Sequence, residues 1–380
     1  MTDRRFDSIV VGVGGMGSAA LYHLARRGQR VLGLEQFDIP NELGSSHGVT
    51  RIIRLAYYEH SSYVPLLRRA YELWRELEAA GERLLYSTGS VDAGPPGSLV
   101  FEGSRRSCLD HDLPHEILDA RQLQRRFPAY RLPPDTLAVL QPDGGFLLPE
   151  RCIVAHVQLA QALGAAVHAR ERVLGWEAAP SGVRVETERG AYEAERLVLT
   201  AGAWMGALAG LPVVAERQVL AWLQPLRPEW FAPERFPVFN LVVPEGRYYG
   251  FPVFGIPGFK FGRYHHLEEP VDLAAVDREP RQADEDVLRA FAERYFPDGA
   301  GPVMALKTCL FENSPDEHFI LDTHPAHSEV VLGAGFSGHG FKFCSVVGEI
   351  LADLALDGST TLDIGFLRLA RFAPLPAEVP

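Results

Sequence analysis

Lysine is scarce in this chain. Of the 37 basic residues only three are lysine, Lys260, Lys307 and Lys342, and the rest are arginine. The ammonium group of lysine is a compact point charge, whereas the guanidinium of arginine spreads its charge over a planar fork. Because arginine fills the ordinary positions for a surface cation, we expect the lysines to have specific roles.

Cysteine and long apolar runs are also sparse. The four cysteines lie at least 35 residues apart, so neighbouring cysteines form no metal-ligand motif and no small disulfide scaffold. We expect reduced thiols in a cytoplasmic protein. The apolar run at residues 9–13 is broken by glycines, which makes it too short for a signal-peptide core or a membrane span.

Positive charge is in deficit. The net charge is −12, which argues against a general nucleic-acid or anionic-membrane surface, because those ligands need a basic field. The 380 residues are 47% hydrophobic and 23% charged, a composition typical of a soluble globular protein. At the usual domain size, this length predicts two or three folding units.

The first 35 residues have the pattern of a mononucleotide-binding unit. In chain order they contain a strand at 8–12, the GxGxxG turn formed by Gly12, Gly14, Gly15, Met16 and Gly17, a helix at 18–27, and a second strand at 30–34 that ends at Glu35. The glycines permit a tight turn and a close approach of pyrophosphate, and the helix N-terminus offers unpaired N–H groups. A carboxylate after the second strand accepts hydrogen bonds from ribose hydroxyls. The pattern predicts dinucleotide binding.

Elements of the same kind return later in the chain. We expect helices at 63–80, 152–163 and 345–356. We expect strands between 167 and 188 and antiparallel strands at 216–270. A buried strand at 196–201 leads into a turn with Gly202 and Trp204, and a strand at 330–334 is followed by a glycine-rich loop at 335–342. Residues 86–145 are broken by proline and glycine pairs, which predicts short strands and turns.

The nucleotide-binding elements therefore lie at the start, the middle and the end of the chain, with strand-rich segments between them. This interleaving favours a flavin-type two-domain fold over a nicotinamide dehydrogenase, whose nucleotide-binding unit is usually continuous. We predict a discontinuous nucleotide-binding domain from residues 1–85, 146–215 and 301–380, and a substrate domain from residues 86–145 and 216–300.

Several longer motifs occur in a characteristic order. They are GSSHGVTRIIR at 44–54, YYGFP at 248–252, GFKFG at 258–262, Cys309 with SPDEHF at 314–319, and GFSGHGFK at 335–342. With these motifs the whole chain resembles the monomeric sarcosine oxidase and N-methyltryptophan oxidase family, within the D-amino-acid oxidase superfamily of FAD enzymes. The resemblance implies an α/β fold, in which a Rossmann-like FAD-binding domain of the glutathione-reductase type is interleaved with an α+β substrate domain built on an antiparallel sheet.

The resemblance also implies how FAD is held. The family attaches the flavin covalently through a cysteine, which matches Cys309, and nearby cations such as Lys307 favour the attacking thiolate. The residues expected to bind FAD are Gly12, Gly14, Gly15, Met16, Gly17, Glu35, Gly44, Ser45, His47, Arg51, Gly202, Trp204, Cys309, Gly338, His339, Gly340, Phe341 and Lys342. Of these, His47 and Arg51 match the family pair beside the flavin, and the helix after the loop at 335–342 directs its N-terminus at the flavin.

Substrate and oxygen have their own expected contacts. Arg54 and Lys342 match the two cations that hold the substrate carboxylate, and Tyr249 is expected beside them. If the segment at 51–54 is helical, Arg51 and Arg54 share one side of it. Lys260 matches the lysine that promotes the reaction of reduced flavin with oxygen. The expected catalytic residues are Lys260, His47, Arg51, Tyr249 and His265.

Two positions depart from the family pattern. Phe311 replaces a tyrosine two residues after the cysteine, which removes a hydroxyl from the substrate pocket. At the place of an active-site histidine stands Tyr264, followed by His265. Either His265 shifts into the site or Tyr264 replaces the histidine.

We therefore expect an FAD-dependent oxidase that demethylates sarcosine or a related N-methyl amino acid to the amino acid, formaldehyde and hydrogen peroxide. The alternatives are a glycine or D-amino-acid oxidase, an amine dehydrogenase that passes electrons to a carrier, and a flavin-binding protein without turnover. The expected partners are a small amine and oxygen, with no nucleic acid, membrane or metal, and the protein is expected to be a monomer.

Overall fold

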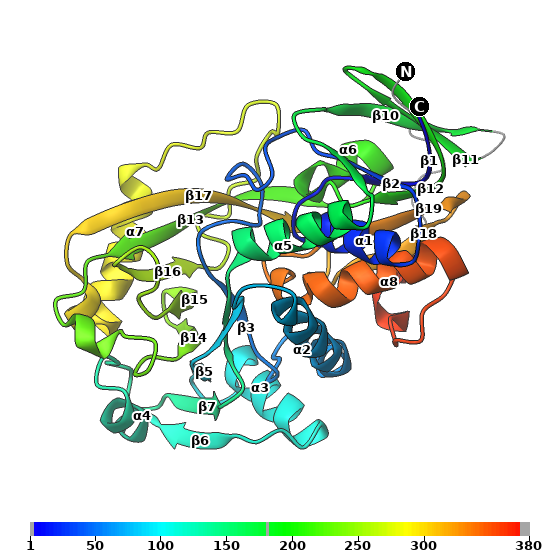
Figure 1. Ribbon diagram of the computed structural model, residues 1–380. Helices are drawn as coiled ribbons and strands as arrows, with labels where there is room; N and C mark the ends of the chain where they lie inside the picture. The colour runs from blue at the N-terminus through cyan, green and yellow to red at the C-terminus, as the bar shows by residue number, and fades with distance from the viewer. Residues whose placement is uncertain (1–3, 180–181, 373–380) are drawn as a thin grey trace.

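Two large sheets organise the molecule (Figure 1). The computed structural model describes residues 4–179 and 182–372. The first sheet contains β1 (Arg5–Val11), β2 (Val31–Leu34), β9 (Ala166–His168), β10 (Val173–Ala179), β11 (Gly182–Thr187), β12 (Gly190–Leu199), β18 (Ile320–His324) and β19 (His327–Ala334). Its centre is a parallel array in the order β9, β2, β1, β12, β19. The carboxyl ends of these strands therefore share one edge, where ligands bind in doubly wound folds.

Three helices cover one face of this sheet, and α1 (Gly15–Arg26) lies between α5 (Pro149–Ala162) and α8 (Cys344–Asp357) (Figure 1). The helix α2 (Tyr63–Ala79) packs against α8. Apolar residues of α1 and α8 meet at the interface, where a Cβ on Gly348 would come within 2.5 Å of the Ala19 Cβ. The small residues bring the two helices close together, and this contact holds the N-terminus of each helix in a defined place.

The second sheet has eight strands in the order β17, β13, β16, β15, β14, β5, β7, β6. These are β5 (Ser90–Gly94), β6 (Glu116–Asp119), β7 (Leu137–Gln141), β13 (Val214–Leu223), β14 (Val238–Val243), β15 (Gly246–Phe251), β16 (Phe259–Arg263) and β17 (Val303–Asn313). All neighbours are antiparallel except β5 and β14. The helix α7 (Gln282–Tyr295) packs on this sheet through Phe291, in a core rich in phenylalanine.

A small third sheet joins the two regions. It consists of β3 (Arg51–Ile53), β8 (Gly145–Leu147) and β4 (Leu85–Ser87), with β8 in the centre. The segment after Arg51 is therefore a strand, and the conditional prediction of a helix at 51–54 does not apply. The strand β3 lies antiparallel beside β8, where Arg51 pairs with Leu147. The short helix α6 (Met205–Ala209) follows the first sheet's β12.

The structure differs from the sequence prediction in residues 86–145, which also contain two helices. They are α3 (Leu99–Asp110) and α4 (Ala120–Arg126). The helix α4 begins at a capping box, in which Asp119 accepts from the Gln122 N–H and the Gln122 side chain accepts from the Asp119 N–H. The proline and glycine residues end the strands and separate the helices from them.

The strand β17 belongs to the antiparallel sheet. Residues 303–313 pair with β13 along almost their whole length, and they lie within the segment 301–380 of the predicted nucleotide-binding domain. Long-range pairing with β13 decides its place, and the sequence of a single strand does not show its partner. As a result Cys309 lies on a strand of the second sheet.

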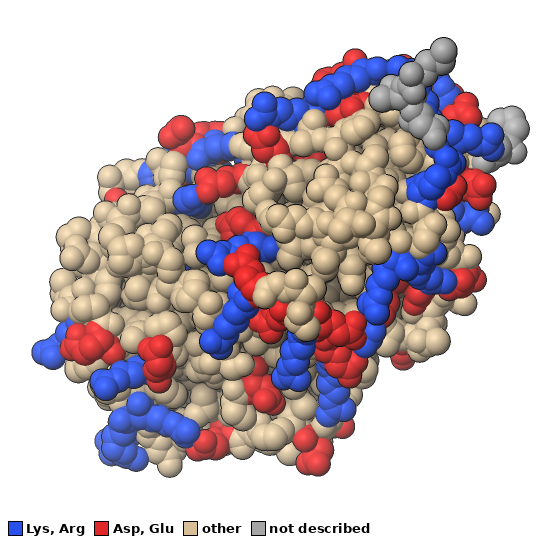
Figure 2. Space-filling model, viewed as in Figure 1, with Lys and Arg blue, Asp and Glu red and all other residues tan. Residues whose placement is uncertain are grey.

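The surface carries charges of both signs. On the face drawn in Figure 2, basic and acidic side chains lie interspersed, many of them beside one another. Among the described residues, no helix combines the length and apolar character needed to cross a bilayer.

Candidate active site

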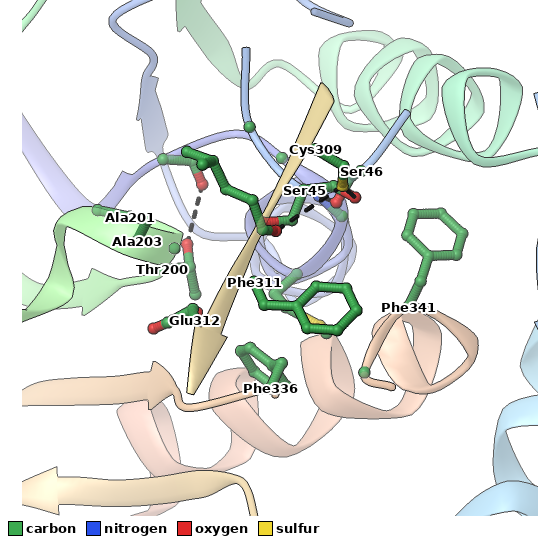
Figure 3. A pocket seen from close by; sticks show the side chains of 18 of the residues that line it. Ser45, Ser46, Thr200, Ala201, Ala203, Cys309, Phe311, Glu312, Phe336 and Phe341 are labelled. Atoms are coloured by element: carbon green, nitrogen blue, oxygen red, sulfur yellow. Dashed lines mark hydrogen bonds between the residues drawn. The ribbon is translucent and has the colours of Figure 1, made fainter. Parts of the chain in front are cut away.

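A long pocket lies between the two sheets. It begins where the carboxyl ends of β1 and β12 meet and extends to the second sheet at Cys309 and Tyr249. Figure 3 shows Ser45, Ser46 and Cys309 around one part of it and Thr200, Ala201 and Glu312 around another. Both sheets therefore contribute to one site.

The glycine turn forms one end of the pocket. Gly12 has φ +86°, and a Cβ there would lie 2.5 Å from Thr200 O. A Cβ on Gly17 would lie 1.8 Å from Gly12 O, so Gly17 permits the helix to pack on the strand and does not line the pocket. Gly14, by contrast, faces open space. The N-cap residue of α1, Gly14, has no side chain to cap the helix, and the Gly15 N–H donates to Ser46 Oγ at 3.3 Å. The positive end of the helix dipole at this N-terminus favours an anionic ligand.

Glu35 lies at the end of β2 beside this turn. Its carboxylate accepts from the Val13 N–H at 2.9 Å and from the Phe37 N–H at 3.0 Å, while burial raises the pKa of the group. Gly202, with φ +56°, and Trp204 line the same end, where the Trp204 ring packs edge-on against Phe37. An open glycine cradle beside a fixed carboxylate fits the pyrophosphate and ribose of a dinucleotide.

Cys309 lies where the second sheet meets the pocket. All four cysteines are reduced and buried, and Cys309 is the one that lines the pocket. Its Sγ lies 3.6 Å from Arg51 Nη2 and 3.6 Å from Ser45 O. Lys307 does not join this group, because its ammonium pairs with Glu42. The cation beside the thiol is therefore Arg51.

His47 is buried close to this group. Neither ring nitrogen has a hydrogen-bond partner among the described residues. Burial, reinforced by the positive charge of Arg51, lowers the pKa of His47 to about 3, so the imidazole is neutral at pH 7. The ring does not form part of the pocket wall, although Gly44 and Ser45 of the same loop do.

Arg54 and Lys342 both line the pocket against the Tyr57 ring, at 4.6 and 5.2 Å from its centroid. Two nitrogens of Arg54 are taken by carboxylates: Nη2 lies 2.8 Å from Glu59 and Nε lies 3.2 Å from Asp92. Its Nη1 has no hydrogen-bond partner among the described residues. Arg54 is thus largely neutralised before any ligand binds.

Lys342 retains more of its hydrogen-bonding capacity. Its ammonium donates to His339 O at 2.6 Å, the one acceptor that the described residues supply. Burial and the nearby Arg54 lower the pKa of Lys342 to about 7, although Glu59 and Asp92 act against this shift. A bound carboxylate would offset both the burial of the ammonium and its repulsion by Arg54, because it pairs with the positive charge.

Aromatic rings enclose the space beside these cations. Tyr249, Phe251, Tyr264 and Phe311 line the pocket, and the Tyr264 ring contacts Tyr249 edge-on at 5.9 Å. His265, the next residue, does not reach the pocket. Its Nδ1 lies 2.7 Å from Glu216 and its Nε2 lies 3.1 Å from Glu317, so the structure places Tyr264 in the position left open by the sequence.

Lys260 stands behind the pocket wall. Its Nζ donates to Gly48 O at 2.7 Å, Thr50 O at 2.5 Å and Thr50 Oγ1 at 3.0 Å, which uses all three N–H groups. Burial lowers the pKa of Lys260 well below its ordinary value. Lys260 thereby holds the segment that connects His47 to Arg51.

The loop at 335–342 closes the pocket between the sheets. Gly338 has φ +75°, and a Cβ there would lie 2.3 Å from the Phe311 ring. His339 is held by Tyr57 Oη at 2.5 Å and by Glu317 O at 2.8 Å. Gly338, His339, Gly340, Phe341 and Lys342 all line the pocket. The loop then leads into the N-terminus of α8.

Polar residues of this pocket or its support that sequence reasoning missed include Glu59, Asp92, Asn240 and Glu312. Asp92 and Glu312 lie inside strands whose other residues are mostly apolar, and this was a usable signal. Asn240 donates to Asp92 at 2.6 Å, a partner that only the pairing of β5 with β14 brings near. Nothing in the sequence around Glu59 indicated its contact with Arg54.

Comparisons with known proteins agree with this geometry. Residues 7–354 match the family described as FAD dependent oxidoreductase. The chain is 43% identical to a monomeric sarcosine oxidase of Streptomyces avermitilis, over 98% of this chain and 99% of the relative, and 36% identical to an N-methyl-L-tryptophan oxidase of Yersinia pestis, over 97% and 99%. Among solved structures, the open form of NikD, an unusual amino acid oxidase, superposes with a TM-score of 0.84 at 28% identity, and covers 96% of this chain and 97% of its own.

The glycine oxidase of Geobacillus kaustophilus has the same fold, with a TM-score of 0.82 at 20% identity over 98% of this chain and all of its own. The glycine cradle, Glu35 and the pocket between the sheets are the features that an FAD of this fold requires. The chain belongs to the FAD-dependent oxidoreductases, in the amine-oxidase family of the monomeric sarcosine oxidases and N-methyl-L-tryptophan oxidases.

Proposed function

We propose that this protein oxidises the secondary amine of an N-methyl amino acid such as sarcosine. The observation that carries the proposal is Lys342, a buried cation with a single protein acceptor, on the wall of a pocket that the rings of Tyr249, Tyr264 and Phe311 also line. Such a site suits a small molecule with one carboxylate and an apolar methylamine.

The chain's own contribution is to bind and orient the substrate. Lys342 and Nη1 of Arg54 hold the carboxylate, and the rings of Tyr249, Tyr264 and Phe311 exclude water around the N-methyl group. Lys342 and Arg54 disfavour a second positive charge nearby, so the amine reacts in its neutral form. Bound FAD would supply the acceptor for the hydride equivalent of the C–H bond and the route by which two electrons and two protons reach oxygen as hydrogen peroxide. The oxidised substrate is an imine, and water converts it to formaldehyde and the amino acid.

We further propose that FAD is linked covalently to Cys309. The thiol lines the pocket, and Arg51 Nη2 stands at 3.6 Å from its sulfur, where an N–H donor stabilises the thiolate needed for attack. Arg51 in turn donates to Ser45 O at 2.9 Å, which holds the guanidinium in place. Cys309 and the glycine cradle line one pocket, with Ser45 and Ser46 between them, as a single cofactor that reaches both needs.

For the reaction with oxygen we propose that Lys260 supplies the positive charge. A buried ammonium stabilises the anion that forms when oxygen accepts an electron. The Lys260 Nζ lies under the loop that connects His47 to Arg51, where it donates to that loop's carbonyl groups. In this proposal Lys260 acts from behind the pocket wall and also holds that part of the wall.

The remaining features of the proposal concern the protein as a whole. We propose a monomer in the cytoplasm, where reducing conditions would keep the four buried cysteines as thiols. We also propose that the segments around the first sheet form the FAD-binding domain, and that the second sheet forms the wall over the substrate.

An anaerobic panel of amines tests the proposed substrate. Sarcosine and other N-methyl amino acids should bleach the oxidised-flavin absorbance, whereas glycine and D-amino acids should do so at least tenfold more slowly. Faster bleaching by glycine or a D-amino acid would replace the proposal with a primary-amine oxidase. Bleaching by none of the amines would reject an amine substrate.

A further inference from the structure

Glu312 is a buried carboxyl group that the proposed reaction does not use. It lies on β17, three residues after Cys309, and is 4% exposed. Its side chain lines the pocket, and in Figure 3 it lies on the side of Thr200, away from Cys309, Ser45 and Ser46. Glu312 therefore lies near the carboxyl ends of the strands of the first sheet, since Thr200 directly follows β12.

One oxygen of Glu312 is held by the backbone. Its Oε1 accepts from the Gly335 N–H at 3.1 Å, and Gly335 follows directly after β19. The main chain is tied to the same loop, since the Ser337 N–H donates to Glu312 O at 2.9 Å. Oε2, by contrast, makes no hydrogen bond to a described residue, and it is not among the atoms sealed in the interior. It therefore faces the space of the pocket.

No cation within the described part of the chain pairs with this carboxyl. Arg51 is engaged by Ser45 and Cys309, Arg54 by Glu59 and Asp92, and Lys342 by His339 O. Burial raises the pKa of Glu312 to about 8, and the Gly335 N–H opposes this shift only in part. FAD brings two phosphate groups into the same pocket, and negative charge nearby raises the pKa of a carboxyl group further.

We propose that Glu312 is a protonated carboxylic acid whose Oε2–H donates a hydrogen bond to FAD. Because Oε1 already accepts from Gly335, the proton belongs on Oε2, which points into the pocket. FAD offers acceptors of two kinds to such a donor, the carbonyl and nitrogen atoms of the flavin ring and the hydroxyls of the ribityl chain. A neutral carboxylic acid can donate a hydrogen bond to these acceptors, whereas a carboxylate would repel them. Buried acids serve as donors in this way in other enzymes.

Other titratable groups around this part of the pocket have their own partners. Cys309 precedes Glu312 on the same strand and contacts Arg51. From the loop at 335–342, His339 is held at both ring nitrogens, and burial lowers its pKa to about 4. Lys342 changes charge near pH 7, and Tyr264 donates to Ser337 O. A transition that depends on Glu312 is therefore identified by replacing Glu312 itself.

The test measures FAD binding to apoprotein as a function of pH, in a Cys309→Ser background that prevents any thioether. The matched variant is Glu312→Gln, whose amide keeps an acceptor for Gly335 N–H and a donor for the pocket but does not titrate. Between pH 7 and pH 10 the Kd for FAD should rise about tenfold more with Glu312 than with Glu312→Gln, in which Lys342 still titrates. An equal rise in both, or no rise with Glu312, would overturn the proposal.

Two further measurements complete the test. Infrared spectra at pH 7 should contain a protonated-carboxyl C=O band that Glu312→Gln lacks and Glu329→Gln retains, because Glu329 lies outside the pocket on the distant part of β19. Absence of a band specific to Glu312 would overturn the protonation. Glu312→Leu, which removes the donor, should weaken FAD about 2- to 10-fold, since one hydrogen bond contributes this much. Unchanged binding by a folded Glu312→Leu would overturn the contact.

The flavin reduction potential then assigns the acceptor. If Glu312 donates to the ring, Glu312→Leu lowers the potential and Glu312→Gln does not. If Glu312 donates to the ribityl chain, both variants keep the wild-type potential while Glu312→Leu still loses affinity. A larger change of potential in Glu312→Gln than in Glu312→Leu would contradict a donor role at either acceptor.

Discussion

Arg51 Nη2 lies 3.6 Å from Cys309 Sγ, although the two residues are 258 positions apart in the chain. Both also contact Ser45 O, so a single carbonyl orients the guanidinium and the thiol. The pair joins the small sheet that contains β3 to the large antiparallel sheet that contains β17. The Cys309 thiol is thereby placed in contact with the Arg51 guanidinium.

The first prediction concerns this pair. Cys309→Ser should release FAD on acid denaturation, whereas wild-type protein keeps its yellow colour in the pellet. Arg51→Gln should slow the incorporation of added FAD into apoprotein at least tenfold, because the thiolate loses its donor. Cys108→Ala, a cysteine buried outside the pocket, is the control and should retain its flavin. Flavin that dissociates from denatured wild type would refute the thioether.

The second prediction uses the carboxylate site. An anionic ligand binds the protonated form of Lys342, and the pKa of Lys342 is about 7 without ligand. The Kd of a short carboxylic acid without an amine, such as isobutyrate, should therefore increase as pH rises above 7, by up to about tenfold per pH unit. The perturbation of flavin absorbance measures this Kd. In Lys342→Met the binding should be weaker and independent of pH between 6 and 9.

Substrates should show the same requirement. Conversion of the carboxylate of a good substrate to an amide should cost about 2 to 5 kcal/mol in kcat/KM, since it leaves Lys342 buried without its anion. Comparable turnover of the acid and the amide would remove Lys342 and Arg54 from this role.

The third prediction separates the two half-reactions. Lys260→Met should slow reoxidation of the flavin by oxygen about 10²- to 10³-fold, because it removes a preorganised cation that serves only that step. Reduction of the flavin by amine should change far less. Stopped-flow absorbance measures both steps. Lys307→Met is the matched control, since Lys307 pairs with Glu42 at the surface and should leave both rates unchanged.

Lys260→Met also leaves the carbonyl groups of Gly48 and Thr50 without their donor, so its stability must be measured beside its rates. Equal slowing of both half-reactions would mean that Lys260 only holds the loop.

The fourth prediction concerns His265, which lies outside the pocket. Hydrogen bonds from the His265 ring to the carboxylates of Glu216 and Glu317 raise the pKa of His265 to about 9, against an ordinary value of 6.5. The charged pair therefore stabilises the fold fully below pH 6.5, and this contribution is lost as pH rises through 9. His265→Asn, which tolerates the positive φ of this residue, should lower the free energy of unfolding at pH 6 by at most about 3 kcal/mol.

Urea denaturation at pH 6, 8 and 10 checks this prediction. The difference in stability between wild type and His265→Asn should shrink between pH 6 and 10, while oxidation of amine at pH 6 should persist in the folded variant. A difference that does not change with pH would contradict the assigned ion pairs.

Much of the first sheet was predictable from local sequence. The glycine turn, α1 and Glu35 follow one another within 35 residues, and their roles depend on backbone geometry that glycine alone permits. The helices near residues 63, 152 and 345 were also predicted, with ends within a few residues of those observed, because their apolar residues recur at helical spacing. The motifs that resemble a known family indicated FAD, and the family is confirmed.

The candidate site was less predictable where it depends on contacts between distant segments. Arg54 was expected to face a substrate, yet Glu59 and Asp92 already occupy two of its nitrogens. The sequence did not decide whether Tyr264 or His265 lies in the pocket. His265 has a positive φ and two carboxylate partners, and these turn its ring away from the pocket. Lys260 was expected to promote the reaction with oxygen, and the sequence did not show that its three donors hold Gly48 and Thr50 behind the pocket wall.

Composition, glycine spacing and hydrophobic periodicity are local properties, and they were sufficient for the nucleotide-binding unit, the main helices and the class of cofactor. Which charges stay unpaired is a different kind of property, because it depends on side chains that strand pairing brings together from hundreds of residues apart. The pairing of β5 with β14 and of β13 with β17 decided that Asp92 meets Asn240 and that Cys309 reaches Arg51. In a buried pocket the energy of a charge is set by its nearest partners and its desolvation, and only the folded chain specifies both.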